Sequence, residues 1–172
     1  RSERILKQKY RFYKIPSLLR YYPKTMPSQT EGLEIRQGLC ALGFEIDRTR
    51  PVGFWNMPQN SKMWHGFSVA ALRQFRPYGA VWLTPPSTDL IIAQCFFEGM
   101  HVYQIEGNSL WLIKDITKLK DLKLPPLPMA QRIHIVRPFD CYIDGCDLTN
   151  DMEAEGRQIT VVDSDFYTNA VS

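Results

Sequence analysis

The sequence lacks any apolar run long enough to cross a membrane. A transmembrane helix needs about 20 consecutive apolar residues, whereas the longest candidate, LIIAQCFF at residues 90–97, has the length of a buried core segment. Internal repeats and low-complexity tracts are also missing from the chain. The remaining composition, 44% hydrophobic and 12% aromatic, is typical of a folded globular protein. We therefore expect a chain without a transmembrane segment that buries a sizeable core.

Complete catalytic motifs are missing as well. The sequence has no glycine-rich loop of the kind that cradles a phosphate, and no serine or cysteine lies in a nucleophile elbow. We therefore expect a binding or assembly module rather than an enzyme. Because the first residue is Arg1, we expect an excised domain or a processed chain that works with protein partners in a larger complex.

Cysteine and histidine are scarce, with four and three residues. Four cysteines in a chain of this size do not make a dense disulfide framework, so we expect an intracellular location, in the cytoplasm or the nucleus. Cys141 and Cys146 have a spacing close to that of a zinc knuckle, but the sequence offers no second close pair of ligands. We expect plain thiols and no cofactor, with a structural zinc or a local disulfide as the alternatives.

Charge is abundant and strongly polarised along the chain. Residues 1–24 contain eight Lys or Arg against one Glu, a net +7, and residues 140–172 contain eight Asp or Glu against one Arg, a net −7. A basic segment attracts phosphates or an acidic partner. We divide the chain at this point into a basic, aromatic-rich helical arm (residues 1–24, the basic arm below) and one α+β domain (residues 25–172).

The basic arm has the composition of a surface for single-stranded nucleic acid. Its cations can neutralise phosphates, and the aromatic side chains between them can stack on unpaired bases. We predict RNA or single-stranded nucleic acid as the partner. The predicted contact residues in the basic arm are Arg4, Lys7, Lys9, Arg11, Tyr13, Lys14, Arg20 and Lys24.

Other interpretations of the same segment stay open. The basic arm could be a solvated amphipathic helix whose aromatic residues pack on the body, or it could bind an anionic membrane or an acidic protein. Trp55, in an irregular stretch, is a further candidate for stacking on a base. A second basic island supports nucleic-acid binding if it lies near the basic arm, and it contains Lys114, Lys118, Lys120 and Lys123.

The acidic end suggests two further functions. Asp163 and Asp165 follow an apolar strand pattern at a spacing of two, which places both carboxylates on one side. They could bind a divalent cation, as in a metal-dependent phosphodiesterase or nuclease. Alternatively, the basic arm of one copy could dock on the acidic end of another, which would make a self-associating homo-oligomeric structural protein.

The order of the sequence patterns predicts an α+β fold with N-terminal helices followed by a mostly antiparallel β-sheet. Residues 101–105 and 110–116 flank a Gly-Asn pair, which predicts a β-hairpin. Helical patterns occupy residues 3–14, 17–22, 32–44 and 62–75, and residues 85–99 favour a helix over a strand. Further strands are predicted at residues 80–84, 132–136, 141–143 and 158–162.

Overall fold

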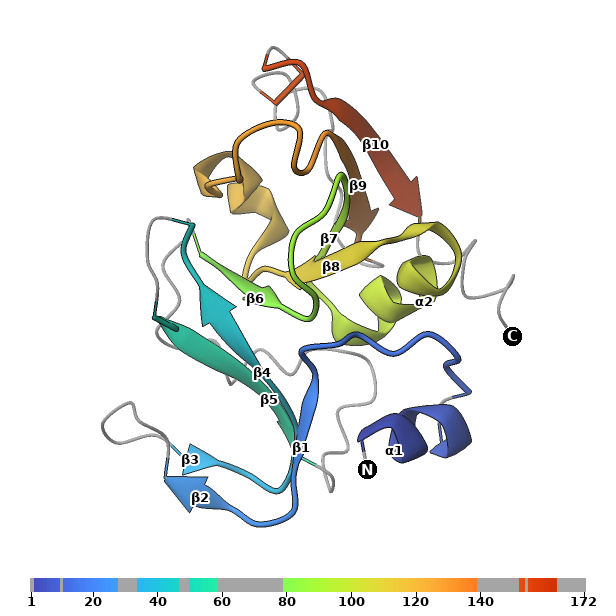
Figure 1. The fold of residues 1–172 in the computed structure, drawn as a ribbon, viewed down its shortest axis with the longest axis vertical. Helices are drawn as coiled ribbons and strands as arrows, with labels where there is room; N and C mark the ends of the chain where they lie inside the picture. Colours follow the sequence, from blue (N-terminus) through green and yellow to red (C-terminus); the bar gives the residue numbers. More distant parts are fainter. Residues whose placement is uncertain are drawn as a thin grey trace.

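The computed structural model describes residues 2–9, 11–27, 34–46, 50–58, 79–138, 152–153 and 155–163. Its main feature is an eight-stranded mixed sheet with the order β1-β4-β6-β8-β7-β9-β10, in which β5 pairs with β4 outside this path (Figure 1). The strands are β1 (Arg20–Tyr22), β4 (Gly38–Phe44), β5 (Gly53–Pro58), β6 (Ala80–Trp82), β7 (Asp89–Ala93), β8 (Ser109–Leu112), β9 (Arg132–Arg137) and β10 (Gln158–Asp163). A separate two-stranded sheet joins β2 (Met26–Pro27) to β3 (Glu34–Ile35).

The sheet has an antiparallel half and a parallel half. The antiparallel half consists of the pairs β1–β4, β4–β5, β4–β6 and β6–β8. In the parallel half, β7 lies between β8 and β9, and β10 pairs with β9 at the end of the sheet. The prediction of a mostly antiparallel sheet after N-terminal helices is therefore wrong, because the strands in the second half of the chain run parallel and α2 lies among them.

Helix α2 (Phe96–Glu106) connects β7 to β8, so the predicted hairpin at this place is wrong. Parallel neighbours need a crossover connection, and a helix is the usual one. Phe96, Met100 and Tyr103 are buried at helical spacing, which gives the segment one face to pack on the sheet. Strand β7 is apolar along most of its length because both of its faces are covered, as is typical of parallel strands.

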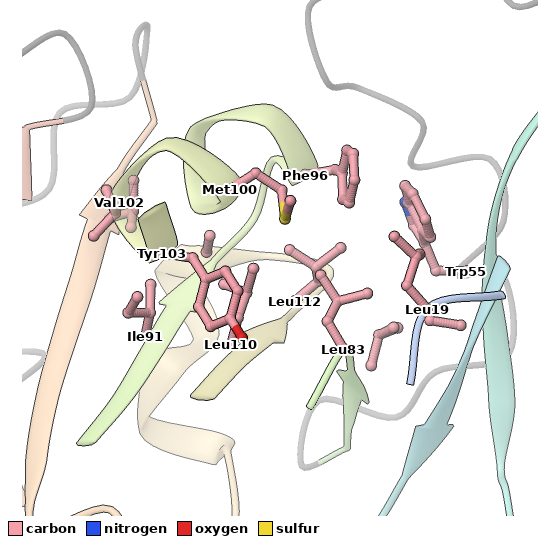
Figure 2. Packing of buried hydrophobic residues seen from close by; sticks show 14 of the residues in the cluster. Leu19, Trp55, Leu83, Ile91, Phe96, Met100, Val102, Tyr103, Leu110 and Leu112 are labelled. Atoms are coloured by element: carbon pink, nitrogen blue, oxygen red, sulfur yellow. The ribbon is translucent and has the colours of Figure 1, made fainter. Parts of the chain in front are cut away.

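Two hydrophobic clusters cover the two faces of the sheet. The first lies between α2 and the sheet, where Met100 and Tyr103 of α2 face Ile91, Leu110 and Leu112 (Figure 2). The second lies on the opposite face and contains Trp111 together with the 3₁₀ helix η2 (Ile116–Asp121). Successive residues of a strand point to opposite faces, and β7 follows this rule, with Ile91 in the first cluster and Leu90 and Ile92 in the second.

The basic arm packs on the body of the protein. Helix α1 (Ser2–Lys9) and the chain up to β1 contribute Leu6, Phe12 and Leu19 to the first cluster. Figure 1 shows the chain leaving α1, passing along α2 and then entering β1. The predicted second helix at residues 17–22 is wrong, because Arg20–Tyr22 pairs with β4 as a strand.

Other predicted elements have different outcomes. The strands at residues 80–84, 132–136 and 158–162 are confirmed as β6, β9 and β10, whereas the helix predicted at residues 32–44 is wrong because β3 and β4 lie there. The helix at residues 62–75 and the strand at residues 141–143 lie outside the described residues. In the part of the chain that the structure describes, no helix is both long enough and apolar enough to span a membrane.

Candidate functional site

Helix α1 separates apolar from cationic side chains. Leu6 is fully buried, whereas Arg4 and Lys7, three positions apart on the same helix, are both exposed. Residues three apart are neighbours on a helix surface, so these two cations lie side by side in solvent. The side chain of Lys9 lies outside the described residues.

A turn after α1 brings the chain back against the helix. Arg11 has a φ of 59°, in the left-handed region that non-glycine residues adopt mainly in turns and after helices. The backbone N–H of Phe12 then donates to the carbonyl oxygen of Leu6 over 3.0 Å. As a result, the exposed side chain of Arg11 lies next to the α1 turn that carries Lys7.

Phe12 anchors this turn in the core. Its side chain is 1% exposed, and its ring meets the His101 ring edge to face with centroids 5.1 Å apart. Nδ1 of His101 is buried and has no hydrogen-bond partner in the described part of the chain. Burial lowers the pKa of His101 below its ordinary value of 6.5, because the charged imidazolium loses solvation there.

Gln104, on α2, holds the next two residues of the basic arm. Its Oε1 accepts hydrogen bonds from the backbone N–H groups of Tyr13 and Lys14, at 3.0 and 2.7 Å. Its Nε2 donates to the carbonyl oxygens of Lys14 and Met100, at 2.9 and 3.2 Å. One amide side chain therefore links the backbone of the basic arm to the last turn of α2.

Tyr13 and Lys14 point to different surroundings. The Tyr13 side chain is 81% exposed, the highest value among the large apolar side chains in the described residues. Lys14 instead donates from Nζ to the carbonyl oxygen of Gly107, and this nitrogen lies 4.6 Å from the centre of the Tyr103 ring. The Lys14 ammonium is thus occupied within the protein, and the Tyr13 ring is presented to solvent.

The remaining cations of the basic arm lie along β1. Arg20 is exposed, and its Nη1 donates to the carbonyl oxygens of Ser17 and Leu19 at 2.6 and 3.1 Å. Lys24 is exposed just after the strand. In Figure 1, α1 and β1 are joined by the chain that passes along α2. The basic arm thus presents one cationic group at α1 and its turn, and a second group along β1.

Trp55 and the second basic island lie away from this surface. Trp55 is 2% exposed and its ring stacks on Phe96 with centroids 4.8 Å apart (Figure 2), so its faces are not open to a ligand. Lys118 and Lys120 are exposed on η2, which packs on the face of the sheet opposite to α1 and α2. The basic island therefore does not extend the surface of the basic arm.

The predicted metal ligands are only partly described. Asp163 is the exposed last residue of β10 and is in register with Arg137 of β9, whereas Asp165 lies outside the described residues, as do Cys141 and Cys146. Among the residues that the structure describes, no three His, Cys, Asp or Glu side chains gather as metal ligands would. Cys40 and Cys95 are buried, and burial raises the pKa values of their thiols to about 12 and about 11.

A polar cluster at the start of β7 is satisfied internally. Asp89 accepts from Nε and Nη2 of Arg132 at 2.5 and 2.8 Å, and Asn108 donates to it at 3.3 Å. The hydrogen bonds from Arg132 are the main reason that the pKa of Asp89 is lowered. The ion pair between Asp89 and Arg132 joins β7 to β9. We therefore assign this cluster a structural role.

The position of Gln104 in the site could not be found from the sequence. Gln104 is separated from Tyr13 and Lys14 by 91 and 90 positions, and no local pattern marks one glutamine in a helix as a partner of a distant backbone.

No protein-family model, curated protein or solved structure matches this chain. The function proposed below is therefore argued from the geometry of the basic arm.

Proposed function

We propose that the chain is a non-catalytic module that binds RNA or another single-stranded nucleic acid through the basic arm, as part of a larger assembly. The observation that carries this proposal is the division of the basic arm into two sides. Leu6 and Phe12 are buried in the core, while Arg4, Lys7 and Arg11 are exposed around the same turn. A folded body thus holds several cations in solvent next to an exposed tyrosine.

This arrangement suits a flexible polyanion better than a rigid duplex. Cations that neutralise phosphates release counterions, which makes the affinity fall with increasing salt. Aromatic rings next to such cations add stacking, which needs bases that are not already paired. We also propose a reducing, intracellular location, in the cytoplasm or the nucleus, because four cysteines are too few for a dense disulfide framework.

The proposal is tested by binding of a fluorescein-labelled single-stranded oligonucleotide, followed by anisotropy over a series of salt concentrations. The test variant Arg4→Glu/Lys7→Glu reverses two exposed cations of α1. The matched control Lys118→Glu/Lys120→Glu reverses two exposed cations of η2 and changes the net charge by the same amount. Each phosphate contact with a single strand contributes about 0.7 to the slope of log affinity against log salt.

We expect the α1 variant to bind at least about tenfold more weakly at low salt and to reduce the magnitude of the salt slope by about 1.4, for two lost phosphate contacts. The η2 variant should stay close to the unmodified protein. If affinity does not depend on salt, or if both variants lose the same affinity, the proposed interface is refuted.

A further inference from the structure

Among the described aromatic residues of the basic arm, Tyr13 has the most exposed side chain. Its neighbours in the sequence are fixed on both sides, because Phe12 is in the core and the Lys14 ammonium binds the Gly107 carbonyl. Between them, the Tyr13 ring is 81% exposed. Removing apolar surface from water is favourable, and this ring obtains little of that gain in the isolated chain.

The backbone that carries this ring is held from the body of the protein. Gln104 accepts from the Tyr13 N–H at 3.0 Å and from the Lys14 N–H at 2.7 Å, and it donates to the Lys14 carbonyl at 2.9 Å. The helix under Gln104 is in turn packed on the sheet through Met100 and Tyr103. Tyr13 is thus mounted on a fixed support, so little backbone entropy remains to be lost when a ligand binds.

Cations lie on the same turn as this ring. Arg11 is two residues away, so its Cα is within about 7 Å of the Tyr13 Cα, and its side chain is exposed. Lys7 is on the α1 turn to which the Phe12 N–H is bonded. A flat ring with positive charge beside it matches a nucleotide, which combines an aromatic base with a phosphate.

We infer that Tyr13 is the platform on which one unpaired base stacks, that Arg11 contacts the phosphate next to that base, and that Gln104 is the positioning residue for the ring. This inference rests on the proposed function and specifies its ligand as an unpaired nucleotide in RNA or DNA. Base stacking on an aromatic side chain tolerates any base, so the platform selects single strands over duplexes without selecting a sequence.

The test separates stacking from charge by comparing two oligonucleotides with the same number of phosphates, one with bases and one abasic. The unmodified protein should prefer the base-bearing strand by about 5- to 150-fold, the range for one stacked base. Tyr13→Ala should remove this preference and leave the affinity for the abasic strand unchanged. Tyr13→Phe should keep the preference, and Ile105→Ala, which trims another exposed apolar side chain, serves as the control.

Gln104→Leu tests whether Gln104 acts by positioning the Tyr13 ring or only by stabilising the fold as a whole. It removes the hydrogen bonds to the Tyr13 and Lys14 backbone while keeping a side chain of similar size. We expect it to reduce the preference for the base-bearing strand, with no change in affinity for the abasic strand and no further effect in a Tyr13→Ala background. Melting curves of all variants confirm that they are folded.

The outcomes distinguish this inference from the proposed function. If neither strand binds, the proposed function fails. If both strands bind equally and with salt dependence, the cations act alone, so the function stands and the stacking platform is refuted. The platform is also refuted if Tyr13→Ala keeps the preference, or if a duplex binds more tightly than either single strand. RNA and DNA versions of each strand show which nucleic acid is preferred.

Discussion

Two polar side chains, the buried Arg157 and the half-buried His101, illustrate how single residues are accommodated. Arg157 was counted in the sequence as the one cation of the acidic end, but it is buried and donates to the carbonyl oxygens of Pro125, Met129 and Ala130 at 2.7–3.1 Å. Its guanidinium is satisfied by these carbonyls and by the Glu155 carboxylate, to which Nε donates at 3.3 Å. His101 is the opposite case, because its buried Nδ1 has no partner among the residues that the structure describes.

The partial burial of the His101 imidazole predicts a pH dependence of stability. Its pKa in the folded protein is lowered from the ordinary 6.5 by burial, so the unfolded chain binds a proton at higher pH than the folded one. Stability should therefore be complete above about pH 6.5 and decrease as the pH falls below it. Urea unfolding between pH 8 and pH 5 should show a smaller decrease for His101→Gln than for the unmodified protein. Parallel curves would contradict this prediction.

At the scale of elements, the close approach of α2 to β7 depends on Gly99. A Cβ at this position would lie 2.9 Å from the Cβ of Ala93 and 3.1 Å from Cδ1 of Leu110. The Ala93 atom cannot move away by side-chain rotation. We expect Gly99→Ala to destabilise the protein by about 1–2 kcal/mol, because a clash of about 1–3 kcal/mol exceeds the gain in helix propensity.

Denaturant unfolding measures the loss of stability in Gly99→Ala, and a second substitution tests whether the contact with Ala93 causes it. In an Ala93→Gly background the nearest obstacle is absent, so Gly99→Ala should cost less there than in the unmodified protein. If Gly99→Ala instead stabilises the protein through its higher helix propensity, α2 and β7 are further apart than the 2.9 Å between the added Cβ and the Cβ of Ala93 implies.

The elements that the sequence predicts correctly are those whose apolar pattern is consistent with only one structure. Residues 132–137 and 158–163 are rich in β-branched residues and form β9 and β10. Residues 101–105, HVYQI, also look like a strand, but they complete α2 because Val102 and Tyr103 pack beside Phe96 and Met100. In this segment tertiary packing overrides local propensity.

The candidate site was predicted in part for a similar reason. The cations and Tyr13 are visible in the composition of residues 1–24. Which aromatic residues turn inward is decided by the body, since Phe12 packs against His101 whereas its neighbour Tyr13 is exposed. The role of Gln104 depends on contacts between segments about 90 positions apart, which no local pattern contains.

At the scale of the whole molecule, the basic arm belongs to the core. Leu6, Phe12 and Leu19 are buried in the first cluster, and each contributes about 1.5–3 kcal/mol when fully buried. Deleting residues 1–19 should therefore remove about 6 kcal/mol, a large part of the 5–15 kcal/mol typical of a domain. Thermal unfolding followed by circular dichroism should show a large decrease or loss of the cooperative transition.

An unchanged transition after the deletion would mean that the basic arm is an appendage to a body that is stable without it. If the transition is lost, truncation cannot be used to study nucleic-acid binding, because loss of binding would then report unfolding. Point substitutions of exposed side chains, such as Arg4→Glu and Lys7→Glu, avoid this difficulty.

The hydrogen bonds between Gln104 and the basic arm also set an order of events during synthesis. Tyr13 is made long before Gln104, and the Leu18 N–H bonds to the carbonyl of Leu83. At the usual 5–20 residues per second, the ribosome takes about 5–20 seconds to add the 91 residues between Tyr13 and Gln104. During this time Tyr13 and Lys14 lack their hydrogen bonds to Gln104, so the cationic segment around them leaves the RNA-rich ribosome without the support of α2.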